Sequence, residues 1–219
     1  MRTLAEQLDE YLASLEERAD PALMAAWTGY TQRVLASGVA GKALAAGMVA
    51  PDFTLPDSTG KPVSLHETLA RGPVVLSFVR GGWCPFCTLT LRALAAAYPA
   101  ITRRGASVLA ISPQTARHCL NTIDGSDLPF PLLSDHDNAV ARSYRLSLEL
   151  PEEVREIYRR FGDDIGAING STRWELPMPA GFVIAPDGRV LLAKVDPRVE
   201  KRLEPTDALK VLDSLALAG

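Results

Sequence analysis

The chain has 219 residues, of which 47% are hydrophobic and 22% are charged, so it is long and apolar enough to fold around its own core. The net charge is −3 and no basic block occurs, so nothing indicates a partner such as nucleic acid or an anionic membrane. Only three cysteines occur, which argues against a secreted disulfide framework and favours a cytoplasmic protein with redox-active thiols.

The start of the chain is charged, and no apolar h-region follows it, so we expect no signal peptide. The longest apolar runs are far shorter than the ~18 residues that a membrane span requires. We therefore expect no transmembrane helix.

Residues 1–45 are predicted to form a helical extension that precedes a domain at 46–219. One helix carries an apolar stripe, and after Asp20-Pro21 a second helix is expected over Ala22–Leu35. The residues of the stripe are Leu4, Leu8, Leu12 and Leu15. Two interpretations stay open: an arm that binds a partner or forms a homodimer, and a helical pair packed on its own domain. The second is favoured, because such stripes usually serve the core of their own chain.

The first half of the domain is predicted to alternate strands with helices. Pro51–Leu55 and Lys61–Leu65 indicate a β-hairpin, and the apolar run Val74–Val79 indicates a buried strand. The further elements expected here are a helix after Cys87, a strand at Ala106–Ile111, a helix at Thr115–Thr122, a strand at Leu132-Leu133 and a helix at Asn138–Tyr144.

The second half of the domain is less regular. Pro151–Phe161 is predicted to be helical and Gly162–Arg173 to be a loop. The segments Gly181–Ala185 and Arg189–Ala193, joined by a turn, are typical of a hairpin, and a last helix is expected at Thr206–Leu217. The order of elements predicts an α/β fold whose central mixed β-sheet is flanked by helices.

Two cysteines stand between the strand at Val74–Val79 and the helix that follows it. The connecting sequence is Arg80-Gly81-Gly82-Trp83-Cys84-Pro85-Phe86-Cys87. This order puts both sulfurs at the start of a helix, where unpaired N–H groups and the helix dipole stabilise a thiolate. A C-x-x-C pair in this position favours a redox-active dithiol.

Two other interpretations of the pair compete with this one. A zinc site would need two more ligands, but the remaining Cys119, His66, His118 and His136 have no matching spacing. The cysteines could also be buried as small apolar residues. The Gly-Gly-Trp approach to a helix start favours reactivity over both alternatives. No metal and no organic cofactor is expected.

Three parts of the chain carry a resemblance to a known family: Pro51–Leu65, Phe130–Asp135 and the hairpin at Phe182–Val190. Together and in this order they resemble the peroxiredoxins of the alkyl hydroperoxide reductase/thiol-specific antioxidant family, over roughly residues 47–195. The resemblance implies a thioredoxin-like fold. It also implies a peroxidase that uses hydrogen peroxide or organic hydroperoxides, and a thiol reductant that is thioredoxin-like or of low molecular weight.

The active-site pattern of that family is Pro-x-x-x-Thr-x-x-Cys, and this chain departs from it. Cys87 takes the position of the peroxidatic cysteine, Cys84 that of the threonine and Arg80 that of the proline. The later arginine of the family falls near Pro179, which instead resembles the thioredoxin proline that follows a cis peptide bond and faces the C-x-x-C pair. The tryptophan directly before the first cysteine, Trp83, also resembles the active-site sequence of thioredoxin.

Two routes therefore stay open for the dithiol. Cys87 could attack a hydroperoxide, after which Cys84 condenses with the sulfenic acid. Alternatively, Cys84 could attack a disulfide substrate and Cys87 resolve the mixed disulfide. Both routes end in a Cys84–Cys87 bond. The alternatives to a peroxidase are thus a protein-disulfide reductase and a redox sensor switched by the same bond.

Cations near the sulfurs would stabilise a thiolate in either route. Arg80 is the nearest in sequence, and Arg173, six residues before Pro179, could reach the pair if its loop folds over the site. Cys119 is predicted to be a half-buried filler rather than a distant resolving cysteine.

Overall fold

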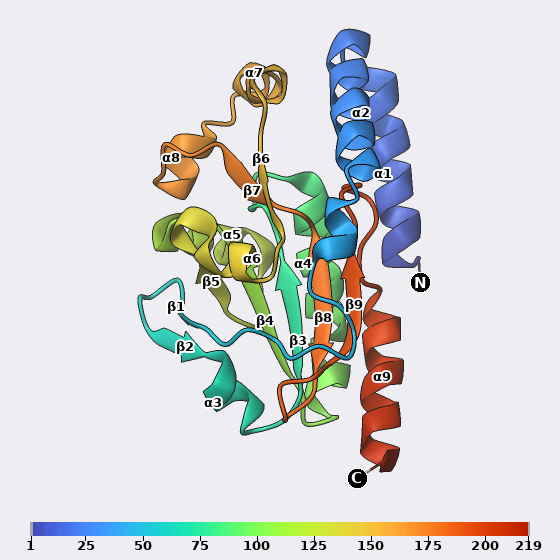
Figure 1. The fold of residues 1–219 in the computed structure, drawn as a ribbon, viewed down its shortest axis with the longest axis vertical. Helices are drawn as coiled ribbons and strands as arrows, with labels where there is room; N and C mark the ends of the chain where they lie inside the picture. The colour runs from blue at the N-terminus through green and yellow to red at the C-terminus, as the bar shows by residue number, and fades with distance from the viewer. Residues whose placement is uncertain (1, 219) are drawn as a thin grey trace.

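The computed structural model describes residues 2–218, and a five-stranded mixed sheet forms its centre (Figure 1). The strands are β3 (Val74–Phe78), β4 (Ser107–Ser112), β5 (Leu132–Ser134), β8 (Ala180–Ile184) and β9 (Val190–Val195). Their order is β5-β4-β3-β8-β9. β3, β4 and β5 run parallel, whereas β8 is antiparallel to β3 and β9 is antiparallel to β8. The predicted α/β class with a central mixed sheet is confirmed.

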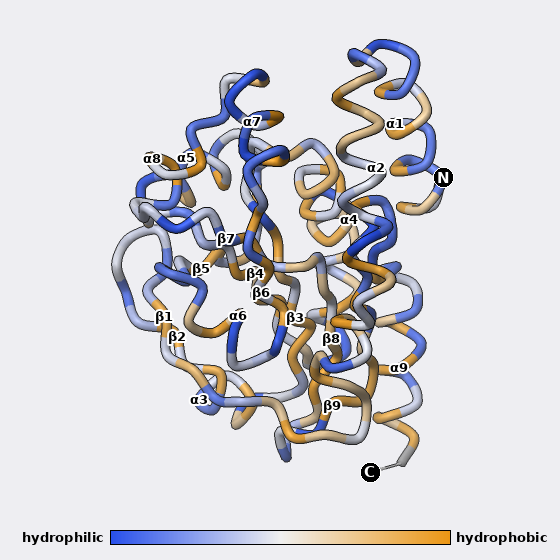
Figure 2. Tube along the Cα trace, turned by 45° about the horizontal axis from the view of Figure 1, so that its top comes forward, coloured by the Kyte–Doolittle hydropathy of each residue, from blue (hydrophilic) through white to orange (hydrophobic). Residues whose placement is uncertain are grey.

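The two faces of β3 enter different parts of the core. Leu76 and Phe78 pack in one apolar cluster, and Val75 and Val79 pack in the other. This alternation follows from the period of two in a strand, and it requires a strand that is apolar throughout because both faces are covered. Figure 2 shows the apolar colouring concentrated on these central strands.

Helices cover both faces of the sheet. One face carries α4 (Pro85–Thr102), α9 (Pro205–Ala218) and α1 (Leu4–Arg18). The other face carries α3 (Leu65–Leu69) and α6 (Ala139–Ser143), together with the hairpin of β1 (Thr54–Pro56) and β2 (Pro62–Ser64). The remaining elements outside the N-terminal pair and residues 147–177 are η1 (Val39–Lys42), α5 (Ala116–Ser126) and η2 (His136–Asn138).

The N-terminal helices pack on the domain. Leu4 and Leu8 of α1 are buried in the core cluster that also holds α4. α2 (Pro21–Ala36) lies antiparallel beside α1 and faces residues 147–177 (Figure 1). This packing corresponds to the interpretation that the sequence favours, a helical pair packed on its own domain. The division of the chain at residues 45 and 46, and the homodimer, stay predictions.

Residues 147–177 differ from the prediction. β6 (Ser147–Glu149) and β7 (Glu175–Pro177) form a two-stranded antiparallel sheet that closes this segment, and α7 (Glu152–Phe161) lies between them. The expected loop at 162–173 contains a short helix, α8 (Ile165–Asn169). The prediction of a loop was wrong because Asp164 caps this helix and its buried Ile165 joins an apolar cluster beneath α7.

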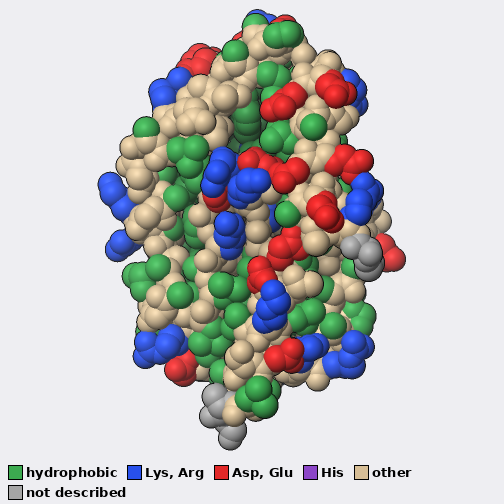
Figure 3. Space-filling view, turned by 90° about the vertical axis from the view of Figure 1, so that its right-hand side faces the viewer, with side chains coloured by type: hydrophobic (Ala, Val, Ile, Leu, Met, Phe, Trp, Pro, Cys, Tyr) green, Lys and Arg blue, Asp and Glu red, His purple; other side chains and the backbone are tan. Residues whose placement is uncertain are grey.

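The side of the molecule that carries α1, α2 and α9 shows acidic and basic side chains interspersed rather than separated by sign (Figure 3). None of the described helices is both long enough and apolar enough to cross a lipid bilayer.

Candidate active site

The cysteine pair lies where the carboxyl end of β3 meets the start of α4. Cys84 is the N-cap residue of α4, Pro85 opens the helix and Cys87 stands in its first turn. Ligand sites in sheets of this kind commonly lie at the carboxyl ends of the parallel strands. Both cysteines are free thiols, and their exposed fractions are 2% for Cys84 and 0% for Cys87.

The two glycines before the pair are required by close packing. A Cβ atom on Gly81 would lie 2.4 Å from the indole nitrogen of Trp83, and the φ of Gly81 is +150°. A Cβ atom on Gly82 would lie 2.4 Å from the hydroxyl oxygen of Thr122 in α5. Only glycine lets the loop approach α5 and lets Trp83 fold back over the loop.

Cys87 is the sulfur that this environment ionises. Its Sγ accepts a hydrogen bond from the backbone N–H of Arg80 at 3.3 Å, and the guanidinium of Arg202 lies 3.9 Å away. Burial alone would raise the pKa of Cys87. The hydrogen bond from the Cys84 thiol and the charges of both arginines outweigh burial, so the pKa of Cys87 is held well below its usual range.

Cys84 is the sulfur that keeps the proton. Burial raises the pKa of Cys84, and the adjacent negative sulfur of Cys87 raises it further, although the guanidinium of Arg80 opposes both effects. The Nη2 of Arg80 donates to the Sγ of Cys84 at 3.0 Å. The surroundings therefore favour ionisation of Cys87 over ionisation of Cys84.

Arg80 is buried, with an exposed fraction of 7%, in an aromatic box. Its Nη1 donates to the hydroxyl of Tyr158 at 3.0 Å, and its guanidinium carbon lies 5.5 Å from the ring centroid of Trp27 and 5.8 Å from that of Trp83. Its Nε has no hydrogen-bond partner within the described chain. Neither Arg80 nor Arg202 pairs with a carboxylate among residues 2–218, and their guanidinium groups instead lie beside the two sulfurs.

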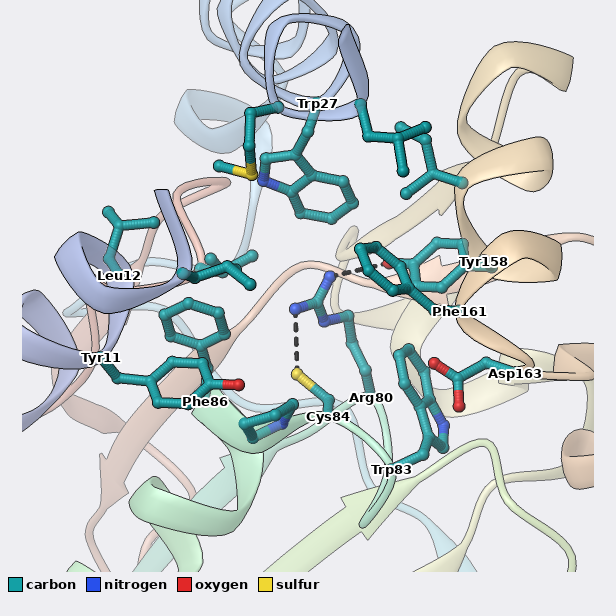
Figure 4. Close-up of a pocket in the computed structure, with 16 residues that line it drawn as sticks. Tyr11, Leu12, Trp27, Arg80, Trp83, Cys84, Phe86, Tyr158, Phe161 and Asp163 are labelled. Atoms are coloured by element: carbon teal, nitrogen blue, oxygen red, sulfur yellow. Dashed lines mark hydrogen bonds between the residues drawn. The ribbon is translucent and has the colours of Figure 1, made fainter. Parts of the chain in front are cut away.

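A cavity of about 320 Å³ opens in front of Cys84 (Figure 4). Its walls come from α1, α2, α7, the loop from Arg80 to the start of α4, and Val199 in the segment that follows β9. Figure 4 shows Trp27 above the guanidinium of Arg80, Cys84 below it and Tyr158 beside it. Cys84 lines the cavity and Cys87 does not, so Cys84 lies between the cavity and the thiolate.

The structure brings together Arg80, Trp83, Cys84 and Cys87, which adjoin in sequence. Pro179 differs. The chain from 2 to 218 contains no cis peptide bond, so the expected cis bond before Pro179 was wrong. The N–H of Met178 instead donates to the carbonyl of Leu146, and the chain continues directly into β8. Pro179 does not line the cavity.

Arg173 is not brought to the pair. It is exposed, its backbone N–H donates to Ser171, and its charge acts on Asp137. The second cation of the site is Arg202, which follows β9 and was missed. No motif surrounds Arg202, and it lies 115 positions from Cys87 in sequence, so its position depends on the complete fold.

Trp27 and Tyr158 were also missed as site residues. Tyr158 stands with Val154 and Ile157 on the apolar face of α7, and this spacing was the one signal that could have directed attention to it. Both side chains lie against Arg80 (Figure 4).

Cys119 is buried in the core beside α4, and its thiol donates to the carbonyl of Gln114 at 3.7 Å. Burial raises the pKa of Cys119 to about 12. The side chain is fully buried, whereas the prediction was a half-buried filler, and a resolving role for Cys119 stays untested. In the described part of the chain, no group of three or more His, Cys, Asp or Glu side chains is arranged to hold a metal ion.

Residues 46–193 match the AhpC/TSA family, so the chain belongs to this family, and the resemblance seen in the sequence is confirmed. It is 34% identical over 119 residues to a chloroplastic peroxiredoxin Q of Triticum aestivum, and the match covers 54% of each protein. It is also 34% identical over 102 residues to a putative peroxiredoxin bcp of Helicobacter pylori, over 47% of this chain and 66% of the relative. The chain thus spans about half to two thirds of these relatives.

Solved structures give the same result for the fold. The peroxidoxin BcpB of Mycobacterium tuberculosis superposes with a TM-score of 0.62 at 25% identity, over 78% of this chain and 98% of that one. The bacterioferritin comigratory protein of Xanthomonas campestris superposes with a TM-score of 0.55 at 21% identity, over 76% of this chain and 91% of that one. These neighbours confirm the thioredoxin-like fold.

Proposed function

We propose that this protein is a thiol-dependent peroxidase that reduces hydroperoxides through a Cys84/Cys87 dithiol–disulfide cycle. The observation that carries the proposal is the surroundings of the buried Cys87, which holds the family's peroxidatic position. Its Sγ accepts the backbone N–H of Arg80 at 3.3 Å and lies 3.9 Å from the guanidinium of Arg202, and its pKa is lowered. Membership of the AhpC/TSA family and relatives named peroxiredoxins support it. The bacterioferritin comigratory protein of Xanthomonas campestris is described as having alkyl peroxide reduction activity.

In the first step the thiolate of Cys87 attacks the terminal oxygen of the hydroperoxide. The oxygen–oxygen bond breaks, Cys87 becomes a sulfenic acid, and an alkoxide or hydroxide leaves. Because Cys84 lies between Cys87 and the cavity, its side chain must turn aside for the hydroperoxide to reach Cys87, and its thiol then gives its proton to the leaving oxygen. The products are an alcohol or water and a thiolate at Cys84.

In the second step the Cys84 thiolate attacks the sulfur of the sulfenic acid. A Cys84–Cys87 disulfide forms, and hydroxide leaves and takes a proton from solvent to become water. The Nη2 of Arg80 at 3.0 Å stabilises the attacking thiolate of Cys84 until the bond forms. One hydroperoxide is reduced by two electrons, and the dithiol loses the same two electrons.

Arg80 and Arg202 supply the electrostatic stabilisation that the family obtains from its threonine and its later arginine. Negative charge passes from sulfur to the leaving oxygen during the first step, and fixed cations in a water-poor site stabilise that charge without reorganising.

The lining of the cavity favours an organic hydroperoxide over hydrogen peroxide. Leu12 and Leu15 of α1, Met24 of α2 and Phe86 of α4 are among the apolar side chains in front of Cys84. An apolar body that leaves water for this lining contributes binding energy of roughly 25 cal/mol per Å² of buried area. Hydrogen peroxide has no such body.

The test is stopped-flow tryptophan fluorescence of the reduced protein mixed with cumene hydroperoxide, because Trp83 adjoins the pair. The reaction should be fast in the wild type and in Cys84→Ser, and absent in Cys87→Ser. Oxidation at the rate of an ordinary free thiol in all three proteins would refute the proposal. Location in the cytoplasm and assembly as a homodimer stay predictions.

A further inference from the structure

We propose that the reductant of this protein is a small aliphatic thiol that enters the cavity and attacks Cys84, and that the docked α1, α2 and α7 exclude a thioredoxin-type protein donor. The inference deepens the proposed function, because it names the class of molecule that returns the Cys84–Cys87 disulfide to the dithiol.

Access to the sulfurs is the first argument. Both cysteines are buried, and of the two only Cys84 lines the cavity. A donor must therefore reach Cys84 through a space of about 320 Å³, near the lower end of the ~300–1,000 Å³ that small-molecule pockets occupy. A thioredoxin-type donor presents its thiol on the surface of a folded domain, whereas side chains of α1 and α2, among them Leu12 and Trp27, line the approach to Cys84 (Figure 4).

The helices that form the walls are anchored to the domain. The carboxylate of Glu204 accepts hydrogen bonds from the N–H groups of Leu4 at 3.2 Å and Ala5 at 2.5 Å, at the start of α1. Lys201 pairs with Asp9 at 3.0 Å. Because Glu204 and Lys201 flank Arg202, the loop that places a cation beside Cys87 also holds α1 in place.

α2 and α7 are joined above the cavity. Arg33 of α2 pairs with Glu153 of α7 at 2.5 Å, and Trp27 of α2 packs edge-on against Tyr158 of α7. A protein donor would have to separate these contacts before its cysteine could reach Cys84.

The composition of the lining is the second argument. Among the lining residues, Arg80 and Asp163 are the charged ones, and most of the others are apolar. A donor with several charged groups, such as glutathione, would lose hydration in this space without gaining partners. An aliphatic thiol would bury its chain against the lining, and the guanidinium of Arg80 would attract its thiolate.

The exchange proceeds by two displacements. The donor thiolate attacks the Sγ of Cys84, the Cys84–Cys87 bond breaks, and the electron pair stays on Cys87, which leaves as a thiolate beside Arg202. A second donor thiolate then attacks the donor sulfur of the mixed disulfide and releases Cys84, which takes up a proton. Two thiols become one disulfide, and the protein gains two electrons.

The test uses the whole chain oxidised with diamide, so that it does not depend on peroxide turnover. Reduction is followed by tryptophan fluorescence and by the mass shift after alkylation. The donors are 2-mercaptoethanol, 1-butanethiol, 1-hexanethiol, glutathione, and thioredoxin with its reductase and NADPH. The rate constants for the small thiols are corrected for thiolate fraction. We expect the rate constant to rise at least 10-fold from mercaptoethanol to hexanethiol, and hexanethiol to exceed thioredoxin at least 10-fold.

Variants of the cavity wall test the route. Leu12→Asp and Met24→Gln should each remove most of the dependence on chain length. Leu120→Asp is the matched control, because Leu120 is exposed on α5 and lies outside the cavity. Glu204→Gln weakens the anchor of α1 and should speed reduction by thioredoxin several-fold. Thermal unfolding of each variant shows whether it is folded.

The proposal is overturned if thioredoxin reduces the wild-type disulfide within 10-fold of the hexanethiol rate, or if chain length changes that rate less than 10-fold. A protein that fails to react with hydroperoxide, yet whose diamide-formed disulfide shows the expected donor preference, would refute the proposed function and leave this inference standing.

Discussion

Arg80 contacts both sulfurs with different groups. Its backbone N–H donates to Cys87 and its guanidinium donates to Cys84, so Arg80→Met removes the charge and keeps the backbone contact. Hydrogen bonds to charged groups contribute about 1.5–3 kcal/mol, so we expect hydroperoxide oxidation to slow about 10- to 100-fold. Stopped-flow fluorescence measures the rate. Arg92→Met, on an exposed position of α4, is the control and should react like the wild type.

The reaction should depend on pH in a way that identifies the thiolate. Because the pKa of Cys87 is held well below its usual range, the thiolate is retained as pH falls through the ordinary cysteine value of about 8.5. The rate should stay flat there and fall only at lower pH. In Arg202→Gln the pKa rises, so the fall should begin at higher pH. Arg198→Gln, on the same loop but paired with Asp196, should leave the profile unchanged.

Cys119 should not take part in the cycle. With a pKa of about 12, only about one Cys119 in ten thousand is ionised at pH 8. Iodoacetamide should therefore spare Cys119 in the folded protein, as mass spectrometry can show. Cys119→Ala should leave the oxidation kinetics unchanged and destabilise the fold by about 1 kcal/mol. A slower oxidation of this variant would assign Cys119 a resolving role.

At the scale of elements, the approach of the active-site loop to α5 leaves no room at Gly82. Gly82→Ala would place a methyl group 2.4 Å from the hydroxyl oxygen of Thr122, and overpacking of this kind costs about 1–3 kcal/mol. Urea unfolding should show this loss, and Thr122→Ala in the same chain should recover part of it. Gly125→Ala is the control, because nothing lies within 4 Å of that site in α5. It should be neutral or stabilising.

The elements that could be predicted from the sequence are those with a local signal. The run Val74–Val79, the hairpin at β8 and β9 and the helix after Cys87 each carry a clear period or turn. β6 and β7 could not be predicted, because each has three residues and pairs with a partner more than 20 positions away. Pro179 was assigned by its likeness to thioredoxin, and the observed chain instead enters β8 through a trans bond.

The residues of the site fall into the same two groups, those with a local signal in the sequence and those without one. Arg80, Trp83 and the cysteines adjoin in sequence, so a local motif was enough to group them. Arg202 reaches Cys87 from the loop between β9 and α9, and no pattern in the chain encodes that approach. Arg173 was the arginine near Pro179 in sequence, and the fold of residues 147–177 keeps it on the surface.

At the scale of the whole molecule, segments that lie outside the residues matching the family help to enclose the site. The family covers residues 46–193, whereas α1, α2 and Arg202 lie beyond its two ends. The N-terminal helices pack on α4 and α7, and α9 packs on the sheet from the other end of the chain. The part of the chain that matches the family thus supplies the dithiol and α7, and the two ends of the chain supply the rest of the enclosure and the second cation.

The thiolate held at Cys87 has a consequence for the redox energetics of the protein. Its cationic partners stabilise the dithiol and have no anion to pair with once the disulfide forms, so the reduction potential should be more positive than the roughly −270 mV of thioredoxin. Equilibration in glutathione redox buffers, with alkylation and mass analysis, measures it. Arg202→Gln should make the potential more negative, and a wild-type value at or below that of thioredoxin would contradict the assignment. With such a reduction potential, the Cys84–Cys87 disulfide can be reduced by donors that are too weak to reduce thioredoxin.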